Sequence, residues 1–336
     1  MKAVVLTDEA EIRLAERPVP VAGPGAVLLR VNACGICGTD LHAPLMSGMF
    51  TSNVVLGHEF AGTVVDTGEG VGDLGAGDEV VVNPIAMACG TCEACRRGFS
   101  NQCLTALTQT SGVAQDGGMA EFVAVERRRL HPVPEGVDVR DAAWTEPLGV
   151  AVRAVGQGSV HAGASIAILG AGAIGQLILQ VALSAGAGES LVVEPSGYRR
   201  EVAKNCGAST VVSPDQVTDV DRLYDVVFDC TGASAALGTA LALVEHGGRV
   251  VVVGSYTSPI TFEARAASAR EASIVFTAVY RDHLEFATAL RLLERGVIDL
   301  GPLTTSILPI TRHEEAFASL RNPEQAVKIL LDPSIP

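Results

Sequence analysis

The most constraining feature of the chain is a glycine pattern that follows an apolar stretch near its middle. Residues 166–169 read Ile-Ala-Ile-Leu, and residues 170–175 read Gly-Ala-Gly-Ala-Ile-Gly. Apolar residues continue from Leu177 to Leu183. This order predicts a strand, a tight turn and a buried helix. The three glycines would allow the turn, the approach of a pyrophosphate and close packing of helix on strand.

Three glycines alone would not establish a nucleotide site, because the chain contains 36 glycines. Residues further along the chain support such a site. Glu194 follows the next apolar strand, where an acid can bind ribose hydroxyls, and two further strands follow at α/β spacing. The alternative is a glycine turn in an α/β domain without a ligand. The candidate cofactor-binding residues are Gly170, Gly172, Ala173, Ile174, Gly175, Glu194, Arg199, Thr231 and Gly254.

Glu194 also indicates whether NAD or NADP is the cofactor. Glu194 would repel a ribose 2′-phosphate, which favours NAD over NADP. Arg199 and Arg200 follow it, and arginines at this place can hold that phosphate. We favour the alternative that both arginines are solvated residues at the start of a helix.

Length and charge narrow the class of protein. With 336 residues the chain can form two domains, each with its own core. The net charge of −14 disfavours a nucleic-acid partner, because phosphates would be repelled. No leader and no long apolar run is present, so we expect a cytoplasmic protein that does not enter a membrane. Its eight cysteines are then expected to be metal ligands or buried thiols.

The first 130 residues contain short β-like runs broken by glycine, proline and aspartate, which predicts a mainly-β domain. Within it lie Cys37 and, about 20 residues later, His58 and Glu59. A thiolate, an imidazole and a carboxylate from separate loops are typical of a catalytic zinc site with an open position. The third ligand is either Glu59 or Glu146, and the sequence leaves this open. Cys34 is expected to be a core residue.

A second cysteine pattern follows. Four thiols at this compact spacing suit a closed tetrahedral zinc site that braces a lobe at about residues 85–105: Cys89, Cys92, Cys95 and Cys103. An iron–sulfur cluster is the main alternative, but no Cys-Pro ends the pattern. The acidic charge argues against a zinc-ribbon nucleic-acid module. Cys206 and Cys230 lack partners at ligand spacing, so we expect buried thiols.

From about residue 150 the pattern changes to alternating strands and helices, which predicts a doubly wound parallel sheet. We therefore divide the chain into a catalytic domain at 1–149, a nucleotide-binding domain at 150–278 and a C-terminal segment at 279–336. The last segment is too short to fold alone, and we expect it to return and complete the first domain.

Together these residues resemble the zinc-containing medium-chain dehydrogenase/reductase family over nearly the whole chain. The motifs that carry the resemblance are Cys37-Gly-Thr-Asp-Leu-His42, Gly57-His-Glu-Phe-Ala-Gly-Thr-Val, Gly77-Asp-Glu-Val, the four cysteines, Glu146-Pro-Leu and the glycine turn. Glu146-Pro-Leu stands where classical alcohol dehydrogenases have a cysteine ligand, which is similar to the sorbitol, threonine and butanediol dehydrogenase branch. The resemblance implies an α/β fold, with a GroES-like mainly-β catalytic domain and a Rossmann nucleotide-binding domain.

The resemblance also implies the metal ligands and the reaction. Cys37 and His58 would hold a catalytic zinc, with Glu59 and Glu146 as exchanging or water-bridged acids. With the four-cysteine site this gives two zinc ions per chain. The activity implied is NAD-dependent oxidation of a secondary alcohol, namely a polyol, vicinal diol, cyclitol or amino alcohol, by a homodimer or homotetramer.

Three further residues receive roles from the family. Thr39 would contact the substrate hydroxyl, Asp40 would orient His58, and His42 would pass the proton to solvent. The match at Tyr280-Arg281 is loose. Substrate-contacting residues are expected on the loops at 43–53 and 107–118, whose composition does not identify a substrate. The alternatives are a zinc-free quinone or enone reductase, which would lack both ligand sets, and a non-catalytic nucleotide-sensing zinc protein.

Overall fold

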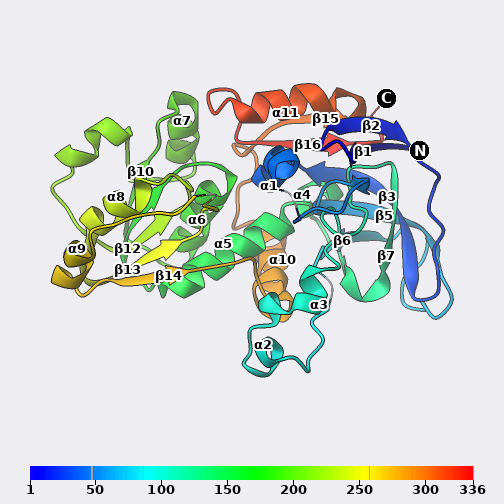
Figure 1. Cartoon of the computed structure of the whole chain (residues 1–336), viewed down its shortest axis with the longest axis horizontal. Helices are drawn as coiled ribbons and strands as arrows, with labels where there is room; N and C mark the ends of the chain where they lie inside the picture. Colours follow the sequence, from blue (N-terminus) through cyan, green and yellow to red (C-terminus); the bar gives the residue numbers. More distant parts are fainter. Residues whose placement is uncertain (47, 86, 257, 336) are drawn as a thin grey trace.

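The computed structural model describes residues 1–46, 48–85, 87–256 and 258–335, and the side chains of residues 282 and 283 are likewise not described. Ser47, within the expected substrate loop at 43–53, lies outside the described residues. Among the described residues, none of the helices is long and apolar enough to cross a membrane. Figure 1 shows two halves, with both ends of the chain in the same half.

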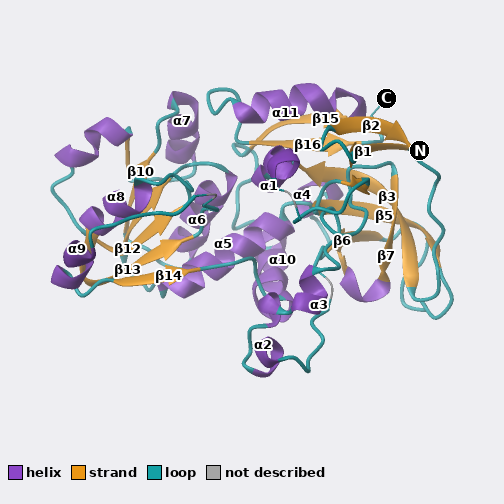
Figure 2. Ribbon diagram, viewed as in Figure 1, coloured by secondary structure: helices purple, strands orange, loops and turns teal. Residues whose placement is uncertain are grey.

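The half that lacks the chain ends is built on a six-stranded parallel sheet (Figures 1 and 2). Its strands are β9 (Ser165–Leu169), β10 (Glu189–Val193), β11 (Thr210–Val212), β12 (Tyr224–Asp229), β13 (Val244–Val252) and β14 (Ser273–Phe276). Their order in space is β11-β10-β9-β12-β13-β14, which is the 3-2-1-4-5-6 order of the Rossmann fold. Every residue of β9 is buried, as expected for a strand covered by helices on both faces.

Helices connect these strands. They are α6 (Ala173–Ser184), α7 (Gly197–Asn205), the 3-10 turn η4 (Pro214–Asp219), α8 (Ala236–Leu243) and α9 (Ala264–Ala269). The predicted strand, turn and helix around the glycine pattern are confirmed, because β9 ends at Leu169 and α6 begins at Ala173. The turn at the carboxyl end of β9 lies where the strand order reverses, which is where such sheets bind ligands.

The other half is mainly β. Its elements before the Rossmann sheet are β1 (Lys2–Leu6), β2 (Ile12–Glu16), β3 (Ala26–Gly35), α1 (Gly38–His42), η1 (Ala43–Leu45), β4 (Val54–Val55), β5 (Glu59–Thr67), β6 (Glu79–Val82), α2 (Glu93–Arg96), η2 (Ser100–Gln102), α3 (Leu104–Leu107), β7 (Phe122–Glu126), η3 (Arg127–Arg129), β8 (Leu130–Pro132), α4 (Val139–Ala142) and α5 (Thr145–Gly158). After that sheet come η5 (Asp282–Phe286), α10 (Ala287–Glu294), β15 (Thr304–Pro309), η6 (Ile310–Arg312), α11 (His313–Arg321) and β16 (Lys328–Asp332).

The C-terminal segment joins the sheet of the N-terminal segment. The order is β15-β16-β3-β5-β6-β8, with β7 also paired to β3, and Leu331 lies opposite Cys34. A smaller sheet holds β2, β1 and β4. The return of the chain end is thus visible in the strand pairing, while the boundaries at 149 and 278 stay predictions.

One hydrophobic cluster connects the halves. It contains Ala61 and Val81 of the mainly-β sheet, Trp144 and Leu148 before and within α5, and Ile166 of the Rossmann sheet. Because protein cores are close-packed, this shared cluster fixes α5 between the two sheets. The first turn of α5 carries Glu146, so the shared core also fixes that acid.

Candidate active site

Cys37 lies at the first turn of a short helix that its own neighbours stabilise. It is the N-cap residue of α1, and its backbone N–H donates to Asp40 Oδ2 at 2.9 Å. This reciprocal capping satisfies amides that the helix start would otherwise leave unpaired. The turn therefore fixes the Cys37 sulfur, the Thr39 hydroxyl and the Asp40 carboxylate relative to one another.

His58 comes from the residues just before β5 and meets this turn from the other side. Its Nε2 lies 3.3 Å from Thr39 Oγ1, and its Nδ1 lies 3.6 Å from Asp40 Oδ1. Asp40 is fully buried, and His58 nearly so. A carboxylate behind one ring nitrogen leaves the other nitrogen to bind a metal, which is how metal-binding histidines are usually oriented.

Electrostatics favour a cation in this cluster. Burial raises the pKa of Asp40 above its usual value. Burial alone would lower the pKa of His58, but Asp40 and Cys37 raise it well above the usual value. The imidazole therefore holds positive charge strongly when no metal is bound. A metal ion would supply that charge instead.

Glu59 begins β5 and is paired with a residue from the far end of the chain. Its carboxylate forms an ion pair with Lys328 of β16, and both side chains are buried. Burial alone would lower the pKa of Lys328, but Glu59 and Cys37 raise it above the usual value. The Lys328 ammonium also lies 5.7 Å from the centre of the Trp144 ring. A charged lysine thus belongs to the cluster.

Glu146 lies in the first turn of α5 and is 7% exposed. Burial raises the pKa of its carboxyl to about 7, despite the opposing effect of nearby His58. Glu59 raises this pKa further, while Lys328 and a hydrogen bond with Tyr280 lower it. Glu146 therefore faces the cluster that contains His58, Glu59 and Lys328.

The ligand atoms of Cys37, His58 and Glu59 all lie within 4.8 Å of one another. Glu146 is not in this set, so among the described residues Glu59 completes the closer trio. Sulfur, imidazole and carboxylate at this separation are a donor set that zinc accepts with a further position open. The residues fit a catalytic zinc ion, and the choice between the two acids stays a prediction.

The four cysteines of the lobe also come together, with their sulfurs within 4.8 Å of one another. A tetrahedral site with Zn–S bonds of about 2.3 Å needs sulfurs about 3.8 Å apart. The Cys89 sulfur accepts the Thr91 hydroxyl at 3.6 Å and the Cys92 N–H at 3.3 Å, and such donors lower the Cys89 pKa to about 5. Thiolates stabilised by backbone N–H groups fit a structural zinc ion.

Among the described residues, the three remaining cysteines have no cluster of metal-ligating side chains around them. Cys34 is fully buried, which confirms it as a core residue. Cys206 and Cys230 are only half-buried, so the expectation of buried thiols was wrong in degree. Gln180 Nε2 lies 3.5 Å from the Cys206 sulfur. This amide comes from α6 and leaves one side of the thiol in a polar setting.

The glycine turn has the geometry that a dinucleotide needs. Gly170 has φ of +88°, which strongly favours glycine. A Cβ on Gly175 would overlap the Gly170 carbonyl, whereas the space around Gly172 is open except for Arg199 Nη1 at 3.8 Å. Ala173 and Ile174 form the first turn of α6. The amino end of α6 therefore accepts a close approach by a pyrophosphate.

Glu194 is buried at the carboxyl end of β10. Its Oε2 accepts the Ala171 N–H of the glycine turn at 2.6 Å, and its Oε1 accepts the Ser196 N–H at 2.9 Å. These bonds place the acid beside the turn. A ribose next to the pyrophosphate would meet this carboxylate.

Thr231 and Gly254 lie at the carboxyl ends of the neighbouring strands. The Thr231 N–H and hydroxyl both donate to Asp229 Oδ1, at 3.0 and 2.8 Å, and the Gly254 N–H donates to the Asp229 carbonyl at 2.9 Å. A Cβ on Gly170 would lie 3.0 Å from Thr231 Cγ2. The structure thus brings both residues to the sheet edge that holds the glycine turn.

The two arginines after Glu194 do not have the predicted solvated positions. Arg199 donates to the Ala326 carbonyl at 2.8 and 3.0 Å, and Arg200 donates to the carbonyls of Glu194 and Pro195 at 2.8 and 2.6 Å. Both are half-buried. The expectation of solvated side chains was therefore wrong, because carbonyl groups of neighbouring segments bind the guanidinium groups.

His42 is exposed at the last turn of α1, two residues after the buried Asp40. Sequence reasoning missed Lys328 as a member of the cluster and assigned nothing to Tyr280. A lone lysine within the otherwise apolar run at 326–331 was a signal for Lys328, since a lysine is rarely buried unless it is paired. No local pattern identified its partner.

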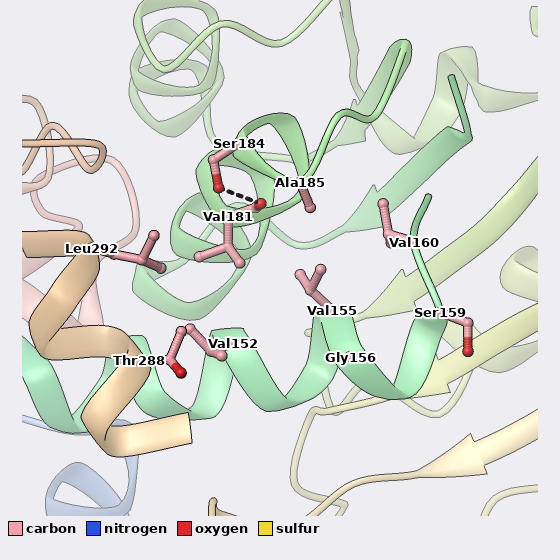
Figure 3. Close-up of a pocket in the computed structure, with 10 residues that line it drawn as sticks. All are labelled: Val152, Val155, Gly156, Ser159, Val160, Val181, Ser184, Ala185, Thr288 and Leu292. Atoms are coloured by element: carbon pink, nitrogen blue, oxygen red, sulfur yellow. Dashed lines mark hydrogen bonds between the residues drawn. The ribbon is translucent and has the colours of Figure 1, made fainter. Parts of the chain in front are cut away.

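A separate hollow of about 370 Å³ lies between α5, α6 and α10 (Figure 3). It is lined mainly by valine, alanine and leucine side chains with two serines and a threonine. None of the lining residues is titratable, so this hollow offers no group for acid–base or metal chemistry. It is not the candidate active site.

The fold and both ligand clusters define a zinc-containing dehydrogenase with a Rossmann nucleotide domain. Residues 23–135 match the family described as alcohol dehydrogenase GroES-like domain, and residues 173–295 match the one described as zinc-binding dehydrogenase. L-threonine 3-dehydrogenase of Pyrococcus horikoshii is 37% identical over 322 residues, covering 92% of this chain and 91% of that protein. Sorbitol dehydrogenase of Halalkalibacterium halodurans is 32% identical over 99% of both chains.

Solved structures of zinc-binding dehydrogenases have the same fold as this chain. A zinc-binding dehydrogenase from Sinorhizobium meliloti bound to NADP has a TM-score of 0.91 and 30% identity, with 99% of both chains covered. The chain therefore belongs to the zinc-containing medium-chain dehydrogenase/reductase family, in the branch with threonine, sorbitol and butanediol dehydrogenases. It is an NAD(P)-dependent alcohol dehydrogenase by class, and the predicted GroES-like and Rossmann fold is confirmed.

Proposed function

We propose that the protein oxidises the secondary alcohol of a polyol, vicinal diol, cyclitol or amino alcohol to a ketone, with NAD as hydride acceptor. The observation that carries this proposal is the trio of the half-buried Cys37 with the buried His58 and Glu59, with Glu146 close by. Relatives named threonine, sorbitol and butanediol dehydrogenase support the substrate class, since all three names denote alcohols with a second polar group.

Each residue of the candidate site would have a separate role in the reaction. When bound, zinc would lower the pKa of the substrate hydroxyl, and NAD would accept the hydride. Cys37, His58 and an acid would hold the metal, while Asp40 orients His58. The Thr39 hydroxyl, which lies 3.3 Å from His58 Nε2, is placed at the metal side of the ring to relay the substrate proton, accepting it while passing its own proton on toward His42. His42 is exposed and would release that proton to solvent.

We also propose that NAD is preferred to NADP. The buried Glu194 would meet a 2′-phosphate with like charge, and the two arginines that could offset it are bound to backbone carbonyls. The first amides of α7 are occupied as well: Glu324 accepts the N–H groups of Gly197 and Tyr198 at 3.1 and 3.3 Å. A 2′-phosphate would therefore find a second carboxylate at the amino end of α7.

Two zinc ions per chain, a homo-oligomer and a cytoplasmic location complete the proposal. The two ligand clusters support the zinc count. Strand β14 is the last in its sheet and carries the exposed Phe276, so a second copy could extend the sheet there. None of the eight cysteines, all of which lie within the described residues, forms a disulfide bond, which suits a reducing compartment. Zinc analysis and sedimentation measure the first two.

The experiment that tests the reaction is formation of reduced coenzyme at neutral to mildly alkaline pH. Zinc-loaded protein receives NAD, or separately NADP, with a panel of polyols, vicinal diols, cyclitols and amino alcohols. We expect turnover within one of these groups, and faster with NAD. Turnover of simple primary alcohols alone would contradict the substrate class, and a preference for NADP would contradict the cofactor assignment.

A further inference from the structure

A short connection between the two halves reaches the proposed zinc site. Residues 277–281, which we call the strap, lead from β14 to η5. Within the strap Val279 has φ of +49°, a left-handed conformation that β-branched residues rarely adopt. Such backbone persists only where the surroundings hold it. Contacts on both sides of Val279 show what holds it here.

On one side, the four-cysteine lobe holds the strap. Asn101 lies in η2, between the third and fourth cysteine, and is only 3% exposed. Its side-chain amide donates to the Ala278 carbonyl at 2.9 Å. Figure 1 shows the lobe, with α2 and α3, beside α10, which follows the strap. The segment that the cysteines close is thus bonded directly to the residue before Val279.

On the other side, the strap inserts Tyr280 beside Glu146. Tyr280 is 1% exposed, and its hydroxyl has two acceptors, Asn83 Oδ1 at 3.3 Å and the Glu146 carboxylate, between which its single proton is shared. The ring packs on Phe286, with 5.4 Å between ring centres. A Cβ on Gly149 would lie 3.1 Å from the Tyr280 ring, so the helix face one turn after Glu146 is open for this ring.

We propose that Tyr280 is a positioning residue for Glu146, and that the four-cysteine lobe holds Tyr280 in place through Asn101. The lobe would then stabilise the buried zinc site without contributing a ligand to it. The inference rests on the proposed function, because it assigns Glu146 to the surroundings of a catalytic zinc ion. Outer hydrogen bonds of this kind commonly change metal affinity 10–100-fold.

The test measures release of zinc from zinc-loaded protein to the chromogenic chelator 4-(2-pyridylazo)resorcinol. Cys37→Ser identifies the release phase that belongs to the lobe. We expect Tyr280→Phe to speed release from the buried site about 10-fold, with the lobe phase unchanged. Asn101→Ala should speed the same phase, and should add little in the Tyr280→Phe background, because both act through one contact. Two control variants should release zinc as the unaltered protein does. Gln102→Ala changes the neighbour of Asn101 in η2, and Tyr224→Phe removes a tyrosine hydroxyl at the amino end of β12.

Three results would overturn the inference: no change in Tyr280→Phe, an effect of Asn101→Ala confined to the lobe phase, or full additivity of the two substitutions. Tyr280→Phe keeps the ring and its packing, so it decides the matter even if Asn101→Ala does not fold. A protein that binds zinc only in the lobe would refute the proposed function itself. Two bound zinc ions with unchanged release rates would refute only the role of Tyr280.

Discussion

The two ligand clusters of this protein stabilise their charged groups in different ways. One is the four-cysteine lobe, and the other, the buried cluster, consists of Cys37, His58, Glu59 and Glu146. In the four-cysteine lobe, the sulfurs come from residues 89–103 and accept hydrogen bonds from the same segment, as Cys89 does from Thr91 and Cys92. In the buried cluster, Glu59 is paired with Lys328, and Glu146 is bonded by Tyr280. These partners come from the other end of the chain.

The difference follows from burial. Three of the four lobe cysteines, Cys89, Cys92 and Cys95, are half-buried, so water screens their charges. An unpaired charge on Glu59 or Glu146 would destabilise the fold far more than one in the lobe, because the protein interior solvates ions poorly. The lobe can therefore be formed by a local sequence motif, whereas the buried cluster requires segments from both ends of the chain. Two substitutions test this contrast, and two more compare it with sites outside the clusters.

Cys95→Ser should have the largest effect, and a local one. Removing one of four sulfurs abolishes a closed zinc site, whose binding energy stabilises the lobe by about 3 kcal/mol or more. We expect the zinc content to fall by one and limited proteolysis to cut between residues 89 and 103, with the Rossmann half still folded. Mass spectrometry of the fragments measures this. Cleavage spread over the whole chain would show that the lobe is not an independent unit.

Lys328→Met should destabilise the buried cluster by about 3 kcal/mol, because it leaves the buried Glu59 without its partner. Lys204→Met is the matched control: Lys204 pairs with Glu201 on an exposed helix face, and its loss should cost less than about 0.5 kcal/mol. Denaturant unfolding gives both values. Equal costs would mean that burial does not distinguish the two ion pairs.

Glu194→Ala should weaken NAD binding about tenfold, equivalent to about 1.4 kcal/mol, and should weaken NADP binding less. The physical reason is that the carboxylate would bind ribose hydroxyls of NAD but repel the 2′-phosphate of NADP. Fluorescence titration with each reduced coenzyme measures the ratio of affinities. An unchanged ratio would remove Glu194 from the ribose site. Glu201→Ala, on the exposed face of α7, serves as the control.

His313→Gln should have the smallest effect, and it measures acid sensitivity outside both clusters. Burial lowers the pKa of His313 below its usual 6.5. A lowered histidine pKa gives stability that is full above pH 6.5 and lost as the pH falls through 6.5 toward the folded value. The variant should lose less stability than the unaltered protein between pH 7 and 5, because it has no imidazole to protonate. The exposed His246 is the control, and an identical pH slope for His313→Gln would refute this effect.

Much of the fold was predictable, because its signals are local. The glycine turn, the buried strand at 165–169 and the four cysteines each occupy a few consecutive residues, and the strand and helix that they predict are present. Residues paired over long distances were not predictable in the same way. The Lys328–Glu59 pair joins β16 to β5, and Arg199 meets the Ala326 carbonyl from another domain. The first contact forms when the chain end returns to the first sheet, and the second forms when the two halves pack together.

The central claim is that the buried cluster binds a catalytic zinc ion independently of the lobe. Zinc content and coenzyme reduction of Cys37→Ser test it most directly. We predict that one of two zinc ions per chain is lost and that turnover falls on the order of 10³-fold, since the Lewis acid contributes several kcal/mol. Thermal unfolding should show the fold intact. Retention of both zinc ions, or of turnover, would contradict the claim.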